Sequence, residues 1–477
     1  MTHIHHEPAA DEHGQHEHAG HAHDQHVHGD HTHGPVAHGA PSDWRAAYTS
    51  AYESAVPDPG REVITIDLEA GEIDWEFEPG HTTKAWGFNG RVPGPTIEAR
   101  VGDVLEVHLT NRLPEPTLIH WHGLRIPAAM DGTDMVQRPI VPRESFTYRF
   151  RLPDAGTFWY HSHINEIVQL ERGLYGALIV RGENEPELDG ERVLVLDDVA
   201  LDDHGEIAPP GSWIEHHDGR QGATRLVNGH REPTLEIAAG QVERWRIVNA
   251  ASARYVRLSI GSRPFTILAT DGGLIDAPIR ATDVLLAPAD RVEVAVGPFT
   301  EGELLNVDAL RYNRRTVARP RNERFATLRV GPAAPSHAVI PPKLRDIPPL
   351  VTGPVTPTRE VHLGVRPSLR HGVDFLINKE QHYHDEPVKV GELQVWDIVN
   401  DTLMDHPFHL HGFFFQVLEV NGEAPAFRSW EDTVNVAPRA RVRIAWMPDN
   451  RPGEWMYHCH ILEHHGSGMM GHFEVVR

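Results

Sequence analysis

Short stretches in which apolar and polar residues alternate recur along the chain from about residue 61. Successive side chains of a strand point to opposite faces, so this period of two predicts β-strands with one buried face. Gly, Pro and Asn interrupt the stretches at the spacing of all-β proteins. The clearest predicted strands are 61–70, 104–111, 145–152, 176–182, 192–198, 291–297, 413–420 and 441–448.

One longer pattern occurs three times, at residues 95–111, 233–249 and 386–400. Each copy has an extended segment, a turn centred on glycine, a second strand and a closing asparagine. Such repetition predicts three copies of one β-sandwich, with a proline-rich linker at 341–359 leading into the third. The expected parts are a disordered histidine-rich tail at 1–45 and β-domains at 46–185, 186–335 and 336–477, the last starting with the linker.

The first 40 residues differ in composition from the rest and contain thirteen histidines among Gly, Ala, Asp and Glu. A stretch of this kind cannot bury a core, which is why disorder is expected. Its imidazoles are suited to weak binding of Cu²⁺, Zn²⁺ or Ni²⁺. The alternative is a solvated or tag-like segment without a function.

The overall composition excludes several classes of protein. Hydrophobic residues make up 40% of the 477, enough for large cores, whereas a formal net charge of −24 argues against a nucleic-acid partner. The single cysteine excludes an internal disulfide and a CxxC motif. No apolar run approaches the ~20 residues that span a bilayer. The opening "MTHIHHEPAA" lacks the basic and apolar regions of a signal peptide, and the compartment stays open.

Four histidine clusters stand out beyond the tail, two in the first predicted domain and two in the third. Each contains a His-x-His pair, whose two side chains project to the same side of a strand. A lone histidine is more often structural, but eight imidazoles in same-face pairs are able to surround a cluster of metal ions. The pairs are His120 and His122, His161 and His163, His409 and His411, and His458 and His460.

The only cysteine, Cys459, stands between two of these histidines and must point to the opposite side of the strand. Its natural partners are His464, five residues later, and His406, with Met469 as a weak axial ligand. One Cys, two His and a distant Met describe a blue-copper electron-transfer centre, in which the soft thiolate suits copper that cycles between Cu(I) and Cu(II). The peptide bonds on either side of Cys459 would connect this centre to the neighbouring cluster.

This arrangement resembles that of the multicopper oxidases, in particular bacterial, laccase-like, three-domain members, over about residues 61–477. The resemblance implies an all-β fold of three consecutive cupredoxin-like Greek-key domains, with a trinuclear copper cluster between the first and the third. It implies four copper ions. The implied ligands are His406, Cys459, His464 and Met469 for type 1 copper; His120 and His409 for type 2 copper; and His122, His161 and His460, and His163, His411 and His458, for the two type 3 coppers.

The resemblance also implies residues that move protons. Asp131, nine residues after His122, matches an acid that the family uses near the cluster; the alternative is a turn residue before Gly132. Related bacterial chains often carry an acid directly after the type 1 histidine. Here that position is His465, and a histidine can shuttle protons near neutral pH. Glu463 is close in sequence, although a strand would turn it to another face.

The electron donor must reach the type 1 copper. One of its histidines, His464 or His406, is expected to present an accessible edge. The segment 427–436 resembles a family segment near this copper. Its candidate substrate-side residues are Trp430, Glu431 and Asp432.

The implied reaction takes single electrons from a reductant and uses four to reduce O₂ to water. The expected reductant is a phenol or an aromatic amine; the alternative is a metallo-oxidase acting on Cu(I), Fe(II) or Mn(II) in metal tolerance. A methionine-rich insertion would favour Cu(I), but the chain has only eight methionines. A copper storage protein would not need Cys459, and a copper nitrite reductase has two cupredoxin domains and no trinuclear cluster, so both are disfavoured.

The expected partners are O₂ and a small reductant, with no nucleic acid and no membrane span, and the chain is expected to be a monomer.

Overall fold

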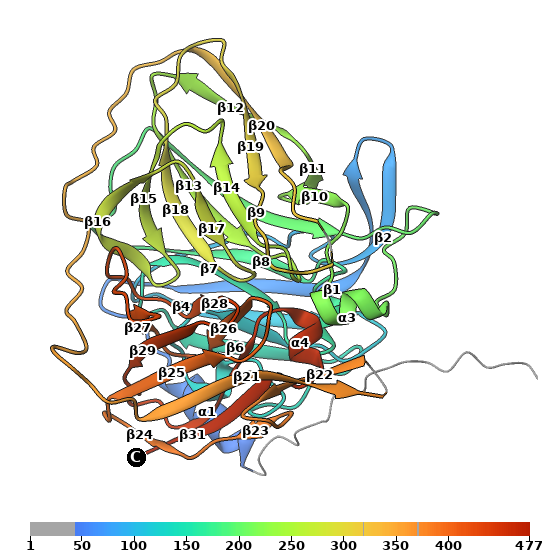
Figure 1. The fold of residues 1–477 in the computed structure, drawn as a ribbon, viewed down its shortest axis with the longest axis vertical. Coiled ribbons are helices and arrows are strands. Elements are labelled where there is room, and N and C mark those ends of the chain that lie inside the picture. The colour runs from blue at the N-terminus through green and yellow to red at the C-terminus, as the bar shows by residue number, and fades with distance from the viewer. Residues whose placement is uncertain (1–42, 318, 370–371) are drawn as a thin grey trace, which may run out of the picture. The chain divides into compact units, whose positions relative to one another are not determined.

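The structure is a computed structural model that describes residues 43–317, 319–369 and 372–477. Of the predicted tail, 1–45, positions 1–42 lie outside the described residues, and helix α1 (Trp44–Ser54) begins at Trp44. Beyond this helix, three successive sets of strands account for most of the regular structure (Figure 1). None of the helices in the described residues is long and apolar enough to cross a membrane.

The first set of strands forms two sheets, in the orders β2-β1-β4-β6 and β3-β8-β7-β5. Leu105 and Tyr148 of one sheet and Trp121 and Leu178 of the other are buried in one core, so the sheets are the two layers of a sandwich. The elements are β1 (Val63–Glu78), β2 (His81–Phe88), β3 (Ile97–Arg100), β4 (Val104–Asn111), β5 (Ile119–His122), η1 (Ala128–Met130), β6 (Ser145–Arg151), β7 (Gly156–Ser162), α2 (Glu166–Gln169) and β8 (Tyr175–Arg181).

The second set forms sheets in the orders β11-β10-β9-β13-β18-β15-β16 and β12-β20-β19-β14-β17. Its core again joins both sheets, through Trp245 and Val294 on one side and Leu258 and Phe325 on the other. The elements are β9 (Gly190–Val199), α3 (Trp213–Asp218), β10 (Thr224–Val227), β11 (His230–Arg231), β12 (Thr234–Ala239), β13 (Glu243–Asn249), β14 (Val256–Ile260), β15 (Phe265–Thr270), β16 (Gly273–Ala281), β17 (Val284–Leu286), β18 (Arg291–Val296), β19 (Leu304–Leu310) and β20 (Glu323–Ala333).

The third set forms sheets in the orders β22-β21-β25-β29-β27 and β23-β31-β30-β26-β28, with β24 also paired to β31. Trp396 and Ile444 meet Phe408 and Tyr457 in its core. The elements are β21 (Arg359–Ser368), β22 (Gly372–Ile377), β23 (Tyr383–His384), β24 (Val388–Lys389), β25 (Gln394–Asn400), β26 (His406–Leu410), β27 (Phe415–Val420), β28 (Thr433–Val436), β29 (Arg441–Trp446), β30 (Gly453–Cys459), α4 (Leu462–Gly466) and β31 (Met470–Val476).

The asparagine that closes each copy of the repeated sequence pattern has the same structural role in all three sandwiches. Asn111, Asn249 and Asn400 end β4, β13 and β25, and all three are buried. The side-chain amides of Asn111 and Asn249 each donate to two backbone carbonyls, at 2.7 and 2.9 Å and at 2.8 and 3.1 Å, and that of Asn400 donates to three, at 2.8, 2.8 and 3.1 Å. Each such strand also pairs in parallel with the first strand of its sandwich. The predicted internal repetition is therefore a structural repetition.

Candidate metal centres

Strands β5 and β7 of the first sandwich face β26 and β30 of the third. In each sandwich the two strands are antiparallel neighbours, with His120 opposite His161 in one and His409 opposite His458 in the other. The four predicted histidine pairs therefore meet in one place, called here the eight-histidine group. Its members are His120, His122, His161, His163, His409, His411, His458 and His460.

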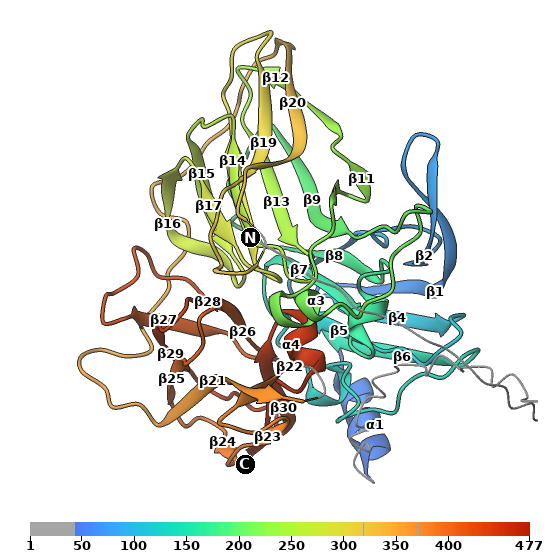
Figure 2. The same cartoon turned by 45° about the vertical axis from the view of Figure 1, so that its right-hand side comes forward.

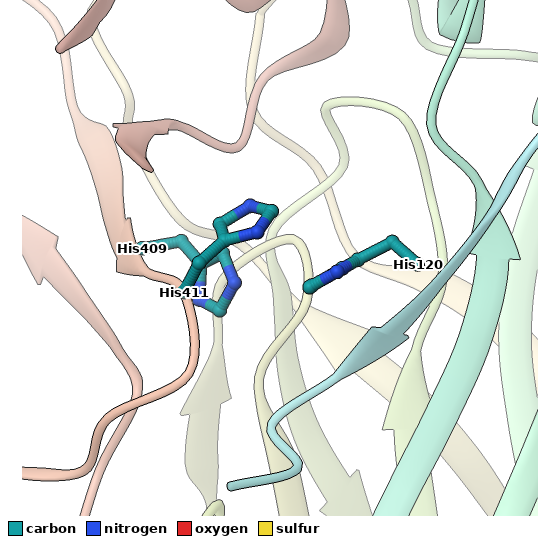
Figure 3. A group of neighbouring side chains, drawn as sticks. All are labelled: His120, His409 and His411. Carbon is teal, nitrogen blue, oxygen red and sulfur yellow. The ribbon is translucent and has the colours of Figure 1, made fainter. Parts of the chain in front are cut away.

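Rings of the eight-histidine group stack directly across the boundary between the two sandwiches. The centroids of His120 and His411 lie 3.9 Å apart, and those of His122 and His409 lie 3.8 Å apart. Figure 3 shows His120 directed from its strand toward His409 and His411 on the facing segment. A site of this kind exists only when the first and third sandwiches are packed together.

The two sets of three rings that the resemblance predicts have the spacing expected around one metal ion each, and so do His120, His122 and His161, at 5.4–5.7 Å. The mutual centroid distances are 5.1, 5.6 and 5.7 Å in the first set and 5.0, 5.1 and 5.7 Å in the second. Three imidazoles bound to one ion at about 2.0 Å place their centroids about 5 Å apart. The first set is His122, His161 and His460, and the second is His163, His411 and His458. His120 and His409, predicted to share the type 2 copper, lie 5.8 Å apart.

The strongest evidence for a metal site is that ring nitrogens of the eight-histidine group are buried without hydrogen-bond partners among the described residues. Within the part of the chain that the structure describes, six of the eight buried histidines have a ring nitrogen to which no protein atom hydrogen-bonds. An unsatisfied buried polar atom costs about 1–3 kcal/mol, and lone pairs directed at a common space are what a metal ion satisfies. The six are His120, His122, His161, His163, His409 and His460.

In four rings of the eight-histidine group a backbone oxygen holds the other nitrogen, which fixes the tautomer that presents a lone pair inward. Among the described residues His460 has no hydrogen-bond partner at either ring nitrogen. Four Nδ1 atoms donate to backbone carbonyls: His120 to Asp131 at 2.8 Å, His161 to Ser162 at 2.8 Å, His409 to Asp432 at 2.9 Å and His458 to Cys459 at 3.0 Å. Burial lowers the pKa of His161 to about 3 and that of His163 to about 4. Neutral imidazole is the form that binds metal, so the residues present fit metal ions.

Asp131, the predicted proton-carrying acid, lies against the eight-histidine group. Its Oδ2 accepts a hydrogen bond from His411 Nδ1 at 2.8 Å, besides the bond from His120 to its backbone carbonyl. Burial raises the pKa of Asp131 to about 8. The residue also closes the turn of η1, because its backbone N–H donates to the Ala128 carbonyl, and it precedes Gly132, whose φ is 83°. Both interpretations of Asp131 are therefore compatible with its geometry.

An acid stands beside His465, and it comes from a distant part of the chain. Glu166 Oε2 lies 2.5 Å from His465 Nδ1, and Glu166 Oε1 lies 3.1 Å from His163 Nδ1. The His465 ring itself stacks on His458 at 4.0 Å. Although burial raises the pKa of Glu166, the imidazoles of His163 and His465 hold that pKa well below its usual range. Sequence reasoning missed Glu166; its position three residues after His163 was the available signal.

Asp432 does not lie on the substrate side, which corrects the expectation for this residue; the roles of Trp430 and Glu431 stay predictions. Its side chain is buried, and its Oδ1 accepts hydrogen bonds from His122 Nε2 at 3.1 Å and from Arg291 at 2.8 Å. The Arg291 guanidinium therefore holds the pKa of Asp432 well below its usual range, against the raising effect of burial. Asp432 orients a ring of the eight-histidine group.

A second group, called here the Cys459 group, lies in the core of the third sandwich. Cys459 Sγ is 3.4 Å from His406 Nδ1 and 3.6 Å from His464 Nδ1, and the two nitrogens are 3.2 Å apart. The backbone carbonyl of Met469, which belongs to the same core, accepts a hydrogen bond from the Cys459 N–H at 3.1 Å. Burial raises the pKa of the Cys459 thiol to about 12, so a bound cation is needed to stabilise its thiolate.

Helix α4 shapes the Cys459 group and corrects one expectation. Residues 462–466 are helical, not a strand, and this turn brings His464 back to the thiol five residues before it. Glu463 is buried on the same helix. Burial raises the pKa of Glu463 to about 7, while the backbone N–H of Arg220 in the second sandwich favours its charged form. Glu463 therefore faces the second sandwich.

The histidines of the Cys459 group do not reach the surface, contrary to the expected accessible edge. His406 and His464 are both 0% exposed. His464 Nε2 donates instead to the backbone carbonyl of His217, on α3, at 3.1 Å. Figure 2 shows α3 directly beside α4. On the outer side of α3, Trp213 is 57% exposed and stacks on the His217 ring at 5.6 Å.

This chain is similar in sequence to known proteins across all three sandwiches. Multicopper oxidase family profiles match residues 69–185, 193–301 and 355–477. Multicopper oxidase MmcO of Mycobacterium tuberculosis is 30% identical over 474 residues, with 90% of each chain covered. The chain belongs to the multicopper oxidase family.

Two further relatives of this multicopper oxidase differ in their described activity. A solved multicopper oxidase of Campylobacter jejuni, described as a metallo-oxidase, is 32% identical, has a TM-score of 0.78 and covers 88% of this chain and 97% of its own. The laccase of Bacillus subtilis is 27% identical over 486 residues, which covers 86% of this chain and 93% of its own.

Family membership confirms several predictions. The protein has an all-β fold with three cupredoxin-like domains, and it is a copper-dependent oxidoreductase that uses O₂. The domain boundaries and the assignment of individual copper ligands stay predictions.

Proposed function

We propose that this multicopper oxidase holds four copper ions in the two groups described above. The Cys459 group, with Met469, would bind type 1 copper. In the eight-histidine group, His120 and His409 would bind type 2 copper, and the two sets of three rings would bind one type 3 copper each. The observation that carries the proposal is the convergence of eight buried imidazoles, six of which have a ring nitrogen without a hydrogen-bond partner among the described residues.

Copper bound in these groups would supply one-electron oxidation at Cys459 and reduction of O₂ at the histidines. The chain connects the two functions through its backbone, because the residues on either side of Cys459, His458 and His460, belong to the second group. Four one-electron oxidations of the donor supply four electrons. With four protons, these reduce one O₂ to two water molecules. Asp131 would carry protons to this group, since its carboxyl contacts His411.

The proposed reductant is a phenol or an aromatic amine, which would bind over α3. The backbone carbonyl of His217 accepts the hydrogen bond from His464, and the indole of Trp213 lies on the outer face of the His217 ring. Ile214, next along the helix, is 47% exposed. An aromatic donor stacked on this apolar surface would be separated from the type 1 histidine by one residue of the helix.

A second candidate substrate is a reduced metal ion. Helix α3 also carries a carboxylate–imidazole pair, in which His217 Nδ1 lies 2.7 Å from Asp218 Oδ1. Oxygen and nitrogen ligands of this kind suit Fe(II) and Mn(II). The metallo-oxidase description of the Campylobacter jejuni relative supports the same candidate.

The two candidates are separated by kcat/KM for a methoxyphenol, Fe(II), Mn(II) and Cu(I), measured as O₂ consumption. Trp213→Ala is expected to lower the value for the phenol roughly 3- to 10-fold through loss of stacking. Leu304→Ala, which removes another exposed apolar side chain of the second sandwich, is the matched control and should change nothing.

His217→Ala keeps the backbone carbonyl and tests the metal candidate. A metal ion as the best substrate, with a value reduced in His217→Ala but not in Trp213→Ala, would establish the second candidate. Failure of every reductant to drive O₂ consumption by the copper-loaded protein would overturn the proposed function.

A further inference from the structure

A third cluster of metal-ligating side chains lies outside both groups. It combines three imidazoles with two thioethers, and it is called here the soft-ligand cluster. β23 and the turn before it supply a fifth His-x-His pair, β31 supplies a histidine and a methionine, and the loop after Asp131 supplies the second methionine. Its members are Met135, His382, His384, Met470 and His472.

Ring nitrogens and sulfur atoms are in direct contact in this cluster. His472 Nδ1 lies 2.7 Å from Met135 Sδ, and His382 Nδ1 lies 3.1 Å from Met470 Sδ. The rings of His382 and His384 are nearly parallel to that of His472, with centroids 6.4 and 5.4 Å away. His384 is paired with His472 in the parallel ladder between β23 and β31, which fixes that contact.

The cluster runs from the surface into the protein. His384 is exposed and His382 is partly exposed, whereas Met470, Met135 and His472 are buried at 8, 6 and 1% exposure. His382 also adopts a left-handed backbone conformation, with φ of 53°, which a residue other than glycine uses sparingly. An ion from solvent would meet His384 and His382 first, then the two thioethers, and His472 last.

The ligand types select the class of ion. Thioether sulfur is a soft ligand that binds Cu(I) well, and imidazole accompanies it in copper sites. All five side chains are uncharged when neutral. The acid next in sequence, Asp385, contacts Tyr457 and Arg359 at 2.8 and 3.0 Å. The five ligands include no carboxylate, although Glu454 interacts electrostatically with His384. The two thioethers favour Cu(I) over Fe(II) or Mn(II).

We propose that the soft-ligand cluster binds one cuprous ion, in addition to the four coppers of the proposed function. The two ligands of each contacting pair would have to separate, since nitrogen and sulfur bound to one ion are about 3.5–4.3 Å apart. Methionine side chains are flexible enough to make this adjustment.

The register of β30 and β31 places the soft-ligand cluster away from the surface of α3, where the electron donor is proposed to bind. Met470 pairs with His458 between β30 and β31, and His472 pairs with Met456. Opposite residues of an antiparallel pair project to the same face. The soft-ligand cluster therefore lies on the face that carries the eight-histidine group, two residues further along, and not beneath α3.

The proposal is tested by Ag(I), a redox-inert probe for Cu(I), added anaerobically to the reduced, copper-loaded, full-length protein. The chain is labelled with ¹³C at the methyl groups of its eight methionines, and each resonance is assigned from its Met→Leu variant. The resonances of Met135 and Met470 are expected to shift together and to saturate together, while that of Met447, which is 43% exposed, does not move.

Affinity provides the second measurement. Met135→Leu combined with Met470→Leu should weaken binding of this Ag(I) ion at least tenfold, whereas Met447→Leu, with the same tail, should leave it unchanged. A shift confined to one or neither of the two resonances, or an equal shift of all eight, contradicts the site. Because the measurement needs no turnover, its failure is distinct from failure of the proposed function.

Discussion

At the scale of single residues, oxygen atoms on the outer side of the eight-histidine group determine which ring nitrogen faces inward. Backbone carbonyls hold four of the rings, and the carboxylates of Asp131, Asp432 and Glu166 contact three others. Groups of this kind fix the tautomer and raise the basicity of a ligating imidazole. Substitution of one of these carboxylates should therefore change the copper affinity and kcat by different factors.

Substitutions of Asp131 can distinguish two roles of its carboxylate: orienting the His411 ring and transferring protons. Asp131→Asn keeps an oxygen that accepts from His411, so it should retain copper while kcat falls about 10²-fold with the lost proton transfer. Asp131→Ala removes both functions and should also lower copper affinity about 10- to 100-fold. Copper analysis with steady-state kinetics distinguishes the two. Equal copper loss in both variants would assign Asp131 a structural role only.

Cys459→Ser is the sharpest change in the Cys459 group. A serine hydroxyl lacks the soft thiolate, so the expected outcome is loss of the blue colour, of about one copper per chain and of oxidase activity. Visible absorption and copper analysis measure these quantities, and the eight-histidine group should keep its copper. If the blue colour survives this substitution, the assignment of Cys459 is wrong.

At the scale of elements, short irregular segments between strands position the decisive side chains. α4 returns His464 to the thiol, η1 places Asp131, and α2 begins with Glu166. The expectation of a strand at Glu463 was wrong. The alternation of side chains in β30 ends at Cys459, and it does not predict the conformation of the residues that follow. Strand geometry, by contrast, predicts that the two members of each histidine pair face the same side, although His163, His411 and His460 lie one residue beyond their strands. The four pairs converge because the first sandwich packs against the third.

Gly132 tests the turn that holds Asp131. Its φ is 83°, and an added Cβ would stand 1.6 Å from the carbonyl oxygen of Ile119, next to His120. Gly132→Ala should therefore displace the turn and lower both copper content and Tm. Gly80→Ala is the matched control, since its φ is 79° with nothing within 4 Å. The control should lower Tm by no more than ~3 °C for its backbone strain. Equal effects of the two substitutions would show that the turn is not needed.

At the scale of the whole molecule, the first and third sandwiches build one site and the second covers the other. The repeated strand pattern and the His-x-His pairs are local features of the sequence, so the fold and the convergence of candidate histidine ligands could be predicted. Contacts between distant segments could not. Asp432 reaches His122 across 310 positions, and His217 reaches His464 across 247. The sequence also did not predict a metal site at His382 and His384, because the neighbouring Met135 and Met470 lie in distant segments of the chain.

The most direct test of the central claim is the ratio of reductant oxidised to O₂ consumed by the full-length, copper-loaded protein. Four one-electron oxidations per O₂, with no hydrogen peroxide formed, are expected if the eight-histidine group acts as one trinuclear site that receives electrons through Cys459. Two oxidations per O₂, with hydrogen peroxide as the product, would contradict that account.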